Sequence, residues 1–341
     1  MKKILVILPR VPYPIEKGDK LRAYHQIKHL SQSNEVYIFA LNDPGSPADP
    51  QAKEILLKFC KGVEIFNLTY WGIALNLFKA LLSNLPLQVG YFYSNKAEKK
   101  INNLVRDINP DHIYCQLVRT ATYAKPHTQT PTTLDYMDAL SKGVERRVSK
   151  VNTLWKLIYK MEAKRLKTFE KNAFNWFNHT IIISEQDRSH LELSNDHRSS
   201  VYIVPNGVDM EYFKPTELNK TYDLLYCGNM NYPPNIDAAL YLVKRILPLL
   251  VEKQPNIKLM IAGANPSPKV IKLAGENVTV TGWVDDIREC YGQAKVFLAP
   301  MQTSIGMQNK ILEAMAMKIP CITSIMANNA IEAVNGESIL L

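Results

Sequence analysis

The chain has 341 residues, more than one ordinary hydrophobic core organises, so we expect two domains. Hydrophobic residues make up 46% and charged residues 21%, the balance of a soluble globular protein, which argues against a disordered chain. Five scattered cysteines argue against a disulfide framework and a zinc site, and the apolar run at 4–8 is too short for a signal peptide. The scattered cysteines suit a reducing compartment, so we expect a cytoplasmic protein. Because no unbroken apolar window approaches about eighteen residues, we expect no transmembrane helix.

In chain order, short apolar runs alternate with longer amphipathic stretches, which predicts an α/β protein with parallel sheets flanked by helices. The strands expected in the first half cover 3–8, 35–41, 63–68, 112–117, 131–136, 179–184 and 201–205. The helices expected between them lie near 20–31, 51–60, 72–83, 96–108 and 142–176. The strands expected in the second half cover 222–228, 257–263, 278–282, 295–300, 319–324 and 338–341. The helices expected there lie near 236–251, 269–273, 287–293, 308–317 and 329–334.

A polar segment at 204–223 separates the two series, and its Pro-Asn-Gly tripeptide marks a turn. We therefore expect two Rossmann-like domains, 1–205 on the acceptor side and 206–341 on the donor side. Open parallel sheets bind ligands at the carboxyl ends of their strands, so the expected site is the cleft between the domains.

Residues 142–171 carry ten Lys or Arg against three Glu, in a chain with a net charge of +9. Such a run indicates a solvated helix, an anionic membrane surface or nucleic acid. The aromatic residues in it, Trp155, Tyr159 and Phe169, have helical spacing, unlike the stacking platforms of single-strand binders. We expect no nucleic-acid partner and keep the first two interpretations open.

The loop 12–22 follows the first expected strand and enters a helix. Gly18 permits a close backbone approach, and with Asp19 it opens a helix whose free N–H groups suit an anion. Positive charge is added by Lys17, Lys20 and Arg22. The dinucleotide fingerprint GxGxxG is absent, which argues against a dinucleotide cofactor. The alternative to an anion site is a plain surface loop.

The stretch 299–316 repeats this arrangement in the second half. A helix is expected to begin near Met307, and the N–H groups of Ile305, Gly306 and Met307 suit a diphosphate. Lys310 in the first turn can reach a phosphate, and Glu313 can accept hydrogen bonds from ribose hydroxyls. The alternative is that Leu-Glu-Ala-Met-Ala is simply good helix-forming sequence.

Five segments in order carry a resemblance: GDKLRAYH at 18–25, VPNGVDMEYFKP at 204–215, LLYCGNMNYPPNIDA at 224–238, VTGWVDDI at 280–287 and NKILEAMAMKIPCIT at 309–323. The chain resembles the retaining glycosyltransferases of family 4 (group 1), which have the GT-B fold, and especially those associated with bacterial exopolysaccharides. The resemblance implies a sugar donor linked to a nucleoside diphosphate, UDP or GDP, with no other cofactor and no bound metal. It implies a polysaccharide or lipid-linked glycan acceptor, which would suit a basic helix at the inner membrane surface.

The family's second motif glutamate matches Glu313, while its first falls on Ile305. Asn229 takes the place of a phosphate-binding arginine, and Pro234 or Asn235 that of a lysine. A charged hydrogen bond contributes about 1.5–3 kcal/mol against about 1 for a neutral one. We expect the Asn-rich loop, with Asn229 and Asn231, and the basic residues Lys17, Lys20, Arg22 and Lys310 to compensate. The alternative is a catalytically weak or inactive module that binds sugar nucleotides.

In the first domain, Gln116 takes the position of a family histidine, where its amide can orient a sugar hydroxyl. Asp135 and Asp138 are expected to face the cleft, to bind acceptor hydroxyls or, for one of them, to act as general base. The alternative is that Asp138 or Ser141 caps the following helix. We select Gln116 and Asp138 as catalytic candidates.

The family continues beyond the motif at 309–323 for several helices that return to the first domain. The donor domain is therefore expected to be incomplete at its C-terminus. We expect a truncated chain or a dimer that covers the exposed surface, with lowered stability and loosely coupled domains.

Overall fold

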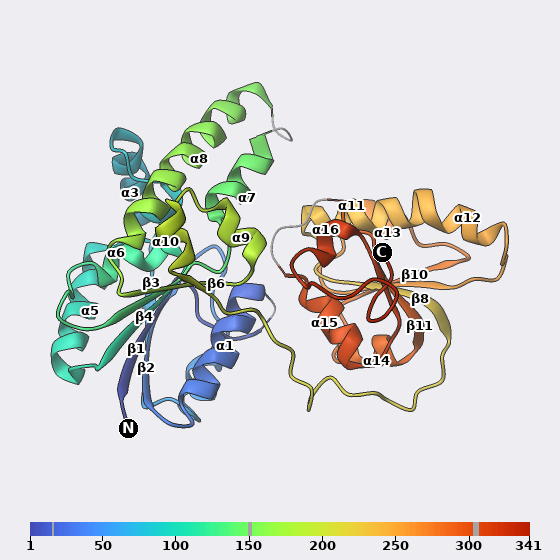
Figure 1. Cartoon of the computed structure of the whole chain (residues 1–341), viewed down its shortest axis with the longest axis horizontal. Helices are drawn as coiled ribbons and strands as arrows, with labels where there is room; N and C mark the ends of the chain where they lie inside the picture. The colour runs from blue at the N-terminus through green and yellow to red at the C-terminus, as the bar shows by residue number, and fades with distance from the viewer. Residues whose placement is uncertain (16, 149–151, 303–306) are drawn as a thin grey trace. The chain divides into compact units, whose positions relative to one another are not determined.

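The computed structural model describes residues 1–15, 17–148, 152–302 and 307–341 (Figure 1). The chain divides into two compact units, Met1–Val204 and Pro205–Leu341. Each unit is built on its own parallel sheet, in the order β3-β2-β1-β4-β5-β6-β7 in the first and β10-β9-β8-β11-β12 in the second. The predicted α/β class is thus confirmed.

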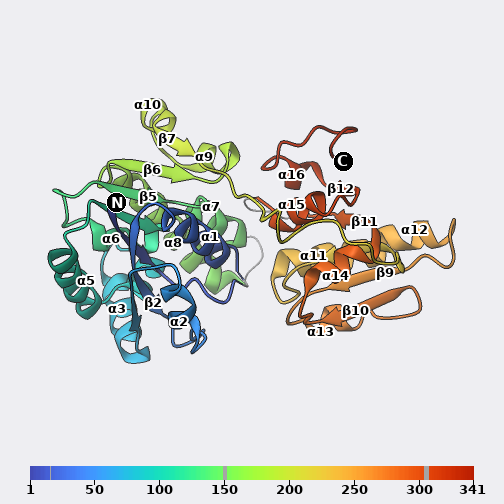
Figure 2. The same cartoon turned by 90° about the horizontal axis from the view of Figure 1, so that it is seen from below.

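The strands of the first unit are β1 Lys3–Leu8, β2 Glu35–Asn42, β3 Gly62–Asn67, β4 His112–Gln116, β5 Thr132–Asp135, β6 His179–Ile182 and β7 Val201–Ile203. Side chains alternate between the two faces of the sheet, so β1 contributes to two cores. Val6 and Leu8 pack in a cluster with residues of α1 and α2, and Leu5 and Ile7 join a cluster on the opposite face. Figures 1 and 2 show α1 and α2 on one side of this sheet and α5 and α6 on the other.

The helices of the first unit are α1 Gly18–Leu30, α2 Ala52–Leu57, α3 Tyr70–Leu82, α4 Leu87–Phe92, α5 Asn95–Ile108, η1 Val118–Thr120, α6 Ala121–Ala124, α7 Leu140–Arg147, α8 Thr153–Phe174, α9 Glu185–His190 and α10 Asn195–Ser199. The single long helix expected at 142–176 was wrong, because α7 and α8 are separate helices. Helix α7 has its C-cap at Val148, and α8 starts after Asn152, whose backbone is extended (φ −65°, ψ 160°). The two helices pack on each other through Val144, Ala163 and Leu166.

The strands of the second unit are β8 Tyr222–Cys227, β9 Leu259–Ala262, β10 Val278–Gly282, β11 Ala294–Ala299 and β12 Cys321–Thr323. Its helices are α11 Pro233–Tyr241, η3 Leu242–Ile246, α12 Leu247–Val251, α13 Pro268–Ile271, α14 Ile287–Gly292, α15 Asn309–Ala316 and α16 Ile325–Asn328. They cover both faces of the sheet, with α11 and α12 on one side and α14 and α15 on the other (Figure 1). The expected helix at 236–251 is present, with a π-helical turn, η3, just before Pro248. A proline lacks the N–H that an unbroken α-helix would use there.

Two expectations near the end of the chain were wrong. Residues 338–341 form isolated bridges rather than a strand, one of them between Ile322 and Leu340. The helix expected at 329–334 is replaced by α16, which starts earlier because Ser324 Oγ caps the N–H of Ala327 (3.3 Å). Asn328 then donates to and accepts from the backbone of Ala333, which closes a turn instead of a helix.

Candidate functional site

At the carboxyl edge of the second sheet, Lys310 lies in the first turn of α15. Its Nζ donates to Asn235 Oδ1 (2.7 Å) and to the hydroxyl of Tyr226 (3.3 Å), and it lies 4.8 Å from the centre of the Tyr226 ring. Asn235 in turn donates to the carbonyl oxygen of Asn229 (2.9 Å). Burial lowers the pKa of Lys310 to about 8, and the neighbouring Cys227 and Glu313 oppose this only in part, so an anionic ligand would favour the charged ammonium.

One turn further along α15, Glu313 is held by a buried tyrosine. The hydroxyl of Tyr291 donates to Glu313 Oε2 (2.9 Å) and contacts the carbonyl oxygen of Lys310 (3.0 Å). Burial raises the pKa of Glu313, while the Tyr291 hydrogen bond and the Lys310 charge act against that rise. Among the described residues, no hydrogen bond reaches the second carboxylate oxygen, Oε1, which leaves it able to accept a hydroxyl.

Two glycines make room for these side chains. Gly228 and Gly263 have φ angles of +149° and +134°, which favour glycine. A Cβ on Gly228 would lie 2.9 Å from Lys310 Nζ, and a Cβ on Gly263 would lie 1.9 Å from the carbonyl oxygen of Gly228. The ends of β8 and β9 therefore approach each other beneath Lys310 in a way that no larger residue permits.

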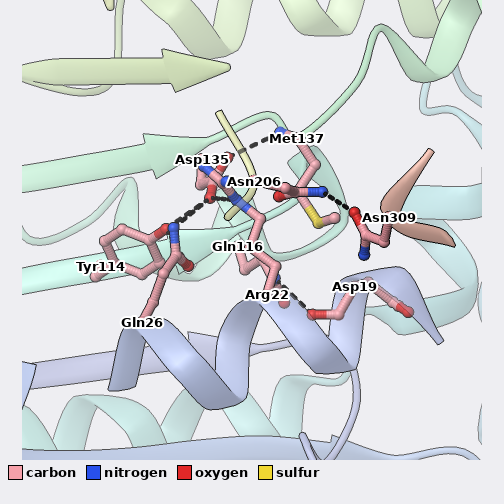
Figure 3. A network of polar contacts seen from close by, with 9 residues as sticks. All are labelled: Asp19, Arg22, Gln26, Tyr114, Gln116, Asp135, Met137, Asn206 and Asn309. Carbon is pink, nitrogen blue, oxygen red and sulfur yellow. Dashed lines mark hydrogen bonds and ion pairs between the residues drawn. The ribbon is translucent and has the colours of Figure 1, made fainter. Parts of the chain in front are cut away.

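The other candidates of the second unit mainly shape its loops. Asn229 Oδ1 accepts from the N–H of Asn231 (3.0 Å), whose side chain is exposed. Helix α15 begins at Asn309 rather than near Met307, because Gln308 is still extended (φ −92°, ψ 94°). Asn206 Nδ2 donates to Asn309 Oδ1 (3.1 Å) at that end of the helix (Figure 3). The candidates Ile305 and Gly306 lie outside the described residues.

In the first unit, three predicted residues come together at the carboxyl edge of the sheet. Gln116, the last residue of β4, donates through Nε2 to the carbonyl oxygen of Asp19 (2.9 Å), in the first turn of α1. Asp19 also forms an ion pair with Arg10. Gly18 is exposed, and a Cβ there would meet nothing within 4 Å. The fold itself thus makes no steric demand for glycine at this position.

Figure 3 shows that Asp135 and Arg22 bind each other, contrary to the predicted ligand roles. Asp135 is fully buried, and its Oδ2 accepts from Arg22 Nε (2.7 Å) and from the hydroxyl of Tyr114 (2.7 Å). Its Oδ1 accepts from the N–H of Met137 (2.9 Å). A buried charge needs such partners, so the fold uses the Asp135 carboxylate internally, and the expectation that Asp135 faces a ligand was wrong.

Asp138 differs from Asp135 in its position: it is half-buried and follows the end of β5 by three residues. Burial raises its pKa to about 6, the charge of Asp187 acts in the same direction, and Arg119 opposes both. The capping alternative was wrong, since Ala139 is the N-cap of α7 and Glu170 Oε1 accepts from the N–H of Ser141 (3.0 Å).

The backbone beside Gln116 and Asp138 is strained. Leu117 and Met137 have φ angles of +62° and +61°, a region that non-glycine residues rarely adopt. They follow the ends of the paired strands β4 and β5, and the N–H of Leu117 donates to the carbonyl oxygen of Asp135 (2.7 Å). Such outliers gather at functional sites, which supports a functional role for this edge.

Sequence reasoning missed two arginines that share one aromatic ring. The guanidinium groups of Arg10 and Arg119 lie 5.8 and 5.4 Å from the centre of Phe92. Burial lowers the pKa of Arg119 to about 10, and its Nη2 donates to Gln88 Oε1 (2.6 Å). Among the described residues, the Nε atoms of both arginines are buried without a hydrogen-bond partner. No local signal reveals this pair, because more than a hundred residues separate the two positions.

Comparison with known proteins places these sites in a family context. Residues 221–341 match the family model described as glycosyl transferases group 1. The chain is similar to an uncharacterized 44.6 kDa protein in the cps region of Klebsiella pneumoniae, with 22% identity over all of this chain and 87% of that protein. Within the described residues, no group of three His, Cys, Asp or Glu side chains is arranged to hold a metal ion.

Solved structures match the whole chain. Sucrose-phosphate synthase from Thermosynechococcus elongatus has a TM-score of 0.66 at 15% identity, covering 100% of this chain and 86% of that one. Anabaena Alr3699/HepE, solved with UDP-glucose, has a TM-score of 0.65 at 15% identity, covering 100% and 85%. TarM, the S. aureus protein, has a TM-score of 0.68 at 11% identity, covering 100% and 89%. The chain therefore has the GT-B fold of glycosyltransferases, and its second unit matches a group 1 glycosyl transferase domain.

Proposed function

We propose that this chain transfers a sugar from a nucleoside diphosphate donor, UDP- or GDP-linked, to a polysaccharide or lipid-linked glycan, with retention of configuration and without a metal. The group 1 match of 221–341 supports transfer, and similar structures were solved with UDP and UDP-glucose. The observation that carries the proposal is the half-buried pair of Lys310 and Glu313 on successive turns of α15. The five free, buried cysteines favour a cytoplasmic location.

Each group of the second unit has a proposed part in donor binding. Lys310 exchanges its neutral partners, Asn235 and Tyr226, for a donor phosphate, which gives the buried ammonium a counter-charge. Glu313 accepts hydroxyls of the ribose through the oxygen that Tyr291 leaves open. The amides of Ile305, Gly306 and Met307, with Asn229 and Asn231, are proposed as further donor contacts on the grounds of the resemblance.

The first unit is proposed to bind the acceptor. With a pKa near 6, Asp138 is mostly ionised at neutral pH and still basic enough to take a proton from an acceptor hydroxyl. Gln116 is buried and donates through Nε2 to the carbonyl oxygen of Asp19, and it is proposed to orient a sugar hydroxyl beside the first turn of α1, at Gly18 and Asp19. Retaining transfer in this fold needs no enzyme nucleophile, so no covalent intermediate is invoked.

A second candidate function is a module that binds sugar nucleotides and turns them over weakly. The observation that favours it is Asn229 and Asn235 at the positions where the family resemblance implies arginine and lysine. Lys310 also gives up contacts to Asn235 and Tyr226 when it binds a phosphate, which reduces the net gain.

Thermal shift with UDP-, GDP- and ADP-sugars tests the donor site. We expect one nucleotide to raise the melting temperature of the wild type, and Lys310→Ala and Glu313→Ala to lower the affinity at least about tenfold each, as loss of a charged hydrogen bond implies. The controls are Lys272→Ala and Glu276→Ala, exposed residues of the same unit.

The thermal-shift result, combined with a transfer assay, distinguishes the transferase from the weakly active module. Stabilisation by no nucleotide, or equal loss in variants and controls, would refute the donor site. Stabilisation without transfer to a membrane-extracted glycan acceptor would favour the weak module over the transferase.

A further inference from the structure

Helix α3 is apolar on the face that it turns to solvent. Trp71, Leu75, Phe78 and Leu82 are 83%, 61%, 60% and 75% exposed, and their spacing puts them on one stripe of the helix. The opposite side, with Ile73 among others, already packs in the core of the first unit. A surface helix normally has polar residues on its outer face, so this second apolar stripe needs an explanation from outside the unit.

The segment of the chain that contains this stripe has no acidic residue. Residues 68–94 contain no Asp or Glu, and Lys79, which is exposed, is the only charged residue among them. An apolar stripe with a single cation therefore occupies a segment of twenty-seven residues. That composition is unfavourable for exposure to water, but it fits a binding partner whose surface is both apolar and anionic.

Basic helix α8 is attached to the end of α3. Arg165 donates through Nη1 to the carbonyl oxygen of Ala80 (2.7 Å) and through Nη2 to that of Leu81 (3.3 Å). Glu162, also on α8, accepts from the N–H groups at the start of α4. Figure 1 shows α3 and α8 close to each other in the first unit.

The charges that α8 exposes are all basic. Its two acidic residues, Glu162 and Glu170, are buried. Trp155 and Leu157 add exposed apolar surface near its first turn. The basic residues of the helix that are exposed are Lys156, Lys160, Lys164 and Lys171.

We propose that the α3 stripe and the exposed lysines of α8 form a docking surface for an anionic lipid membrane. Apolar side chains enter the interfacial region, while the lysines attract acidic headgroups and Trp71 lies where tryptophan is favoured. The helix spans 13 residues, about 20 Å at 1.5 Å per residue, which is too short for a hydrocarbon core of about 30 Å. Among the described residues, no helix is long and apolar enough to cross a bilayer. The contact is therefore interfacial.

The charges also argue against a second copy of the chain as the occupant. In a symmetric dimer through this stripe, both sides of the interface would carry the same cations, Lys79 and the α8 lysines, and neither side would bring an acidic partner from residues 68–94 or an exposed one from α8. Like charges brought together across an interface oppose association, whereas anionic lipid relieves the same repulsion.

Flotation with vesicles tests the surface on the full chain without donor or acceptor, so its outcome is independent of transferase activity. We expect binding to vesicles with 30% phosphatidylglycerol, roughly tenfold or more above that to pure phosphatidylcholine, and a decrease as salt is added. Leu75→Glu combined with Phe78→Glu should reduce binding about tenfold or more. Leu249→Glu on α12, where the leucine is also 61% exposed, should not.

Circular dichroism and melting curves establish that each variant is folded before binding is compared. If the stripe instead mediates contact with a second copy, light scattering will show a dimer. Conversion of that dimer to a monomer by Leu75→Glu with Phe78→Glu, without any change in vesicle binding, overturns the proposal. Equal binding to neutral and anionic vesicles, or no binding by the folded wild type, overturns it as well.

Discussion

Asp135 and Asp138 are only three residues apart in the sequence, but one is fully buried and the other half-buried, and their environments differ. The Asp135 carboxylate is held by Arg22, by the hydroxyl of Tyr114 and by the N–H of Met137. Among the described residues, no ion pair holds the Asp138 carboxylate; burial and the charge of Asp187 raise its pKa, and the charge of Arg119 opposes them. Residue type alone does not separate these cases, because the distinction depends on what lies within a few ångströms.

Replacing Asp138 tests its proposed role as general base. A base must be ionised, so wild-type transfer should fall as the pH decreases through about 6. Asp138→Asn should reduce the rate by about 100-fold or more and abolish that acid limb. Pre-steady-state rates between pH 5 and 8 measure both effects, and Asp107→Asn, an exposed aspartate of the same unit, is the control. An unchanged acid limb in the Asp138 variant would assign the titration to another group.

At the scale of elements, a buried carboxyl group links the two helices of the α7–α8 hairpin. Glu170 on α8 accepts from the N–H of Ser141 at the start of α7. Burial raises the pKa of Glu170 to about 7, so the folded state binds its proton more tightly than the unfolded chain does. Its contribution to stability is therefore most favourable below the unfolded pKa, near 4.5, and is lost as the pH rises to about 7.

Glu170→Gln keeps an oxygen that can accept from Ser141 and removes the charge. The variant should be more stable than the wild type at pH 8, by up to about 1.4 kcal/mol per unit of pKa difference, and similar to it near pH 4.5. Urea unfolding at both pH values measures the difference. Glu98→Gln, on α5, serves as a control, and a stability gain that does not change with pH would contradict the assignment.

At the scale of the molecule, each unit has its own core. The buried cluster built on β8–β12 contains residues of Pro205–Leu341, and the clusters built on β1–β7 contain residues of Met1–Val204. A ligand held by Lys310 and Glu313 should therefore stabilise the second unit more than the first.

This division can be tested by measuring hydrogen exchange with and without the nucleotide that the thermal-shift experiment identifies. We expect slower exchange in β8, α11 and α15 and little change in β2 and β3. Lys310→Ala should remove the protection, whereas Lys272→Ala should leave it. Equal protection of both sheets would contradict a donor site confined to the second unit.

Hydrophobic periodicity was enough to predict the α/β class and the strands β1–β12, because the spacing of apolar residues is a local property of each backbone type. The positions of Lys310 and Glu313 on α15 could be predicted for the same reason, since they follow from a strand, a loop and a helix in succession. The pairing of Arg22 with Asp135 and the position of Arg10 beside Phe92 were not predictable. Each depends on residues far apart in the chain, whose distance, burial and charge are set only when the sheet brings them together.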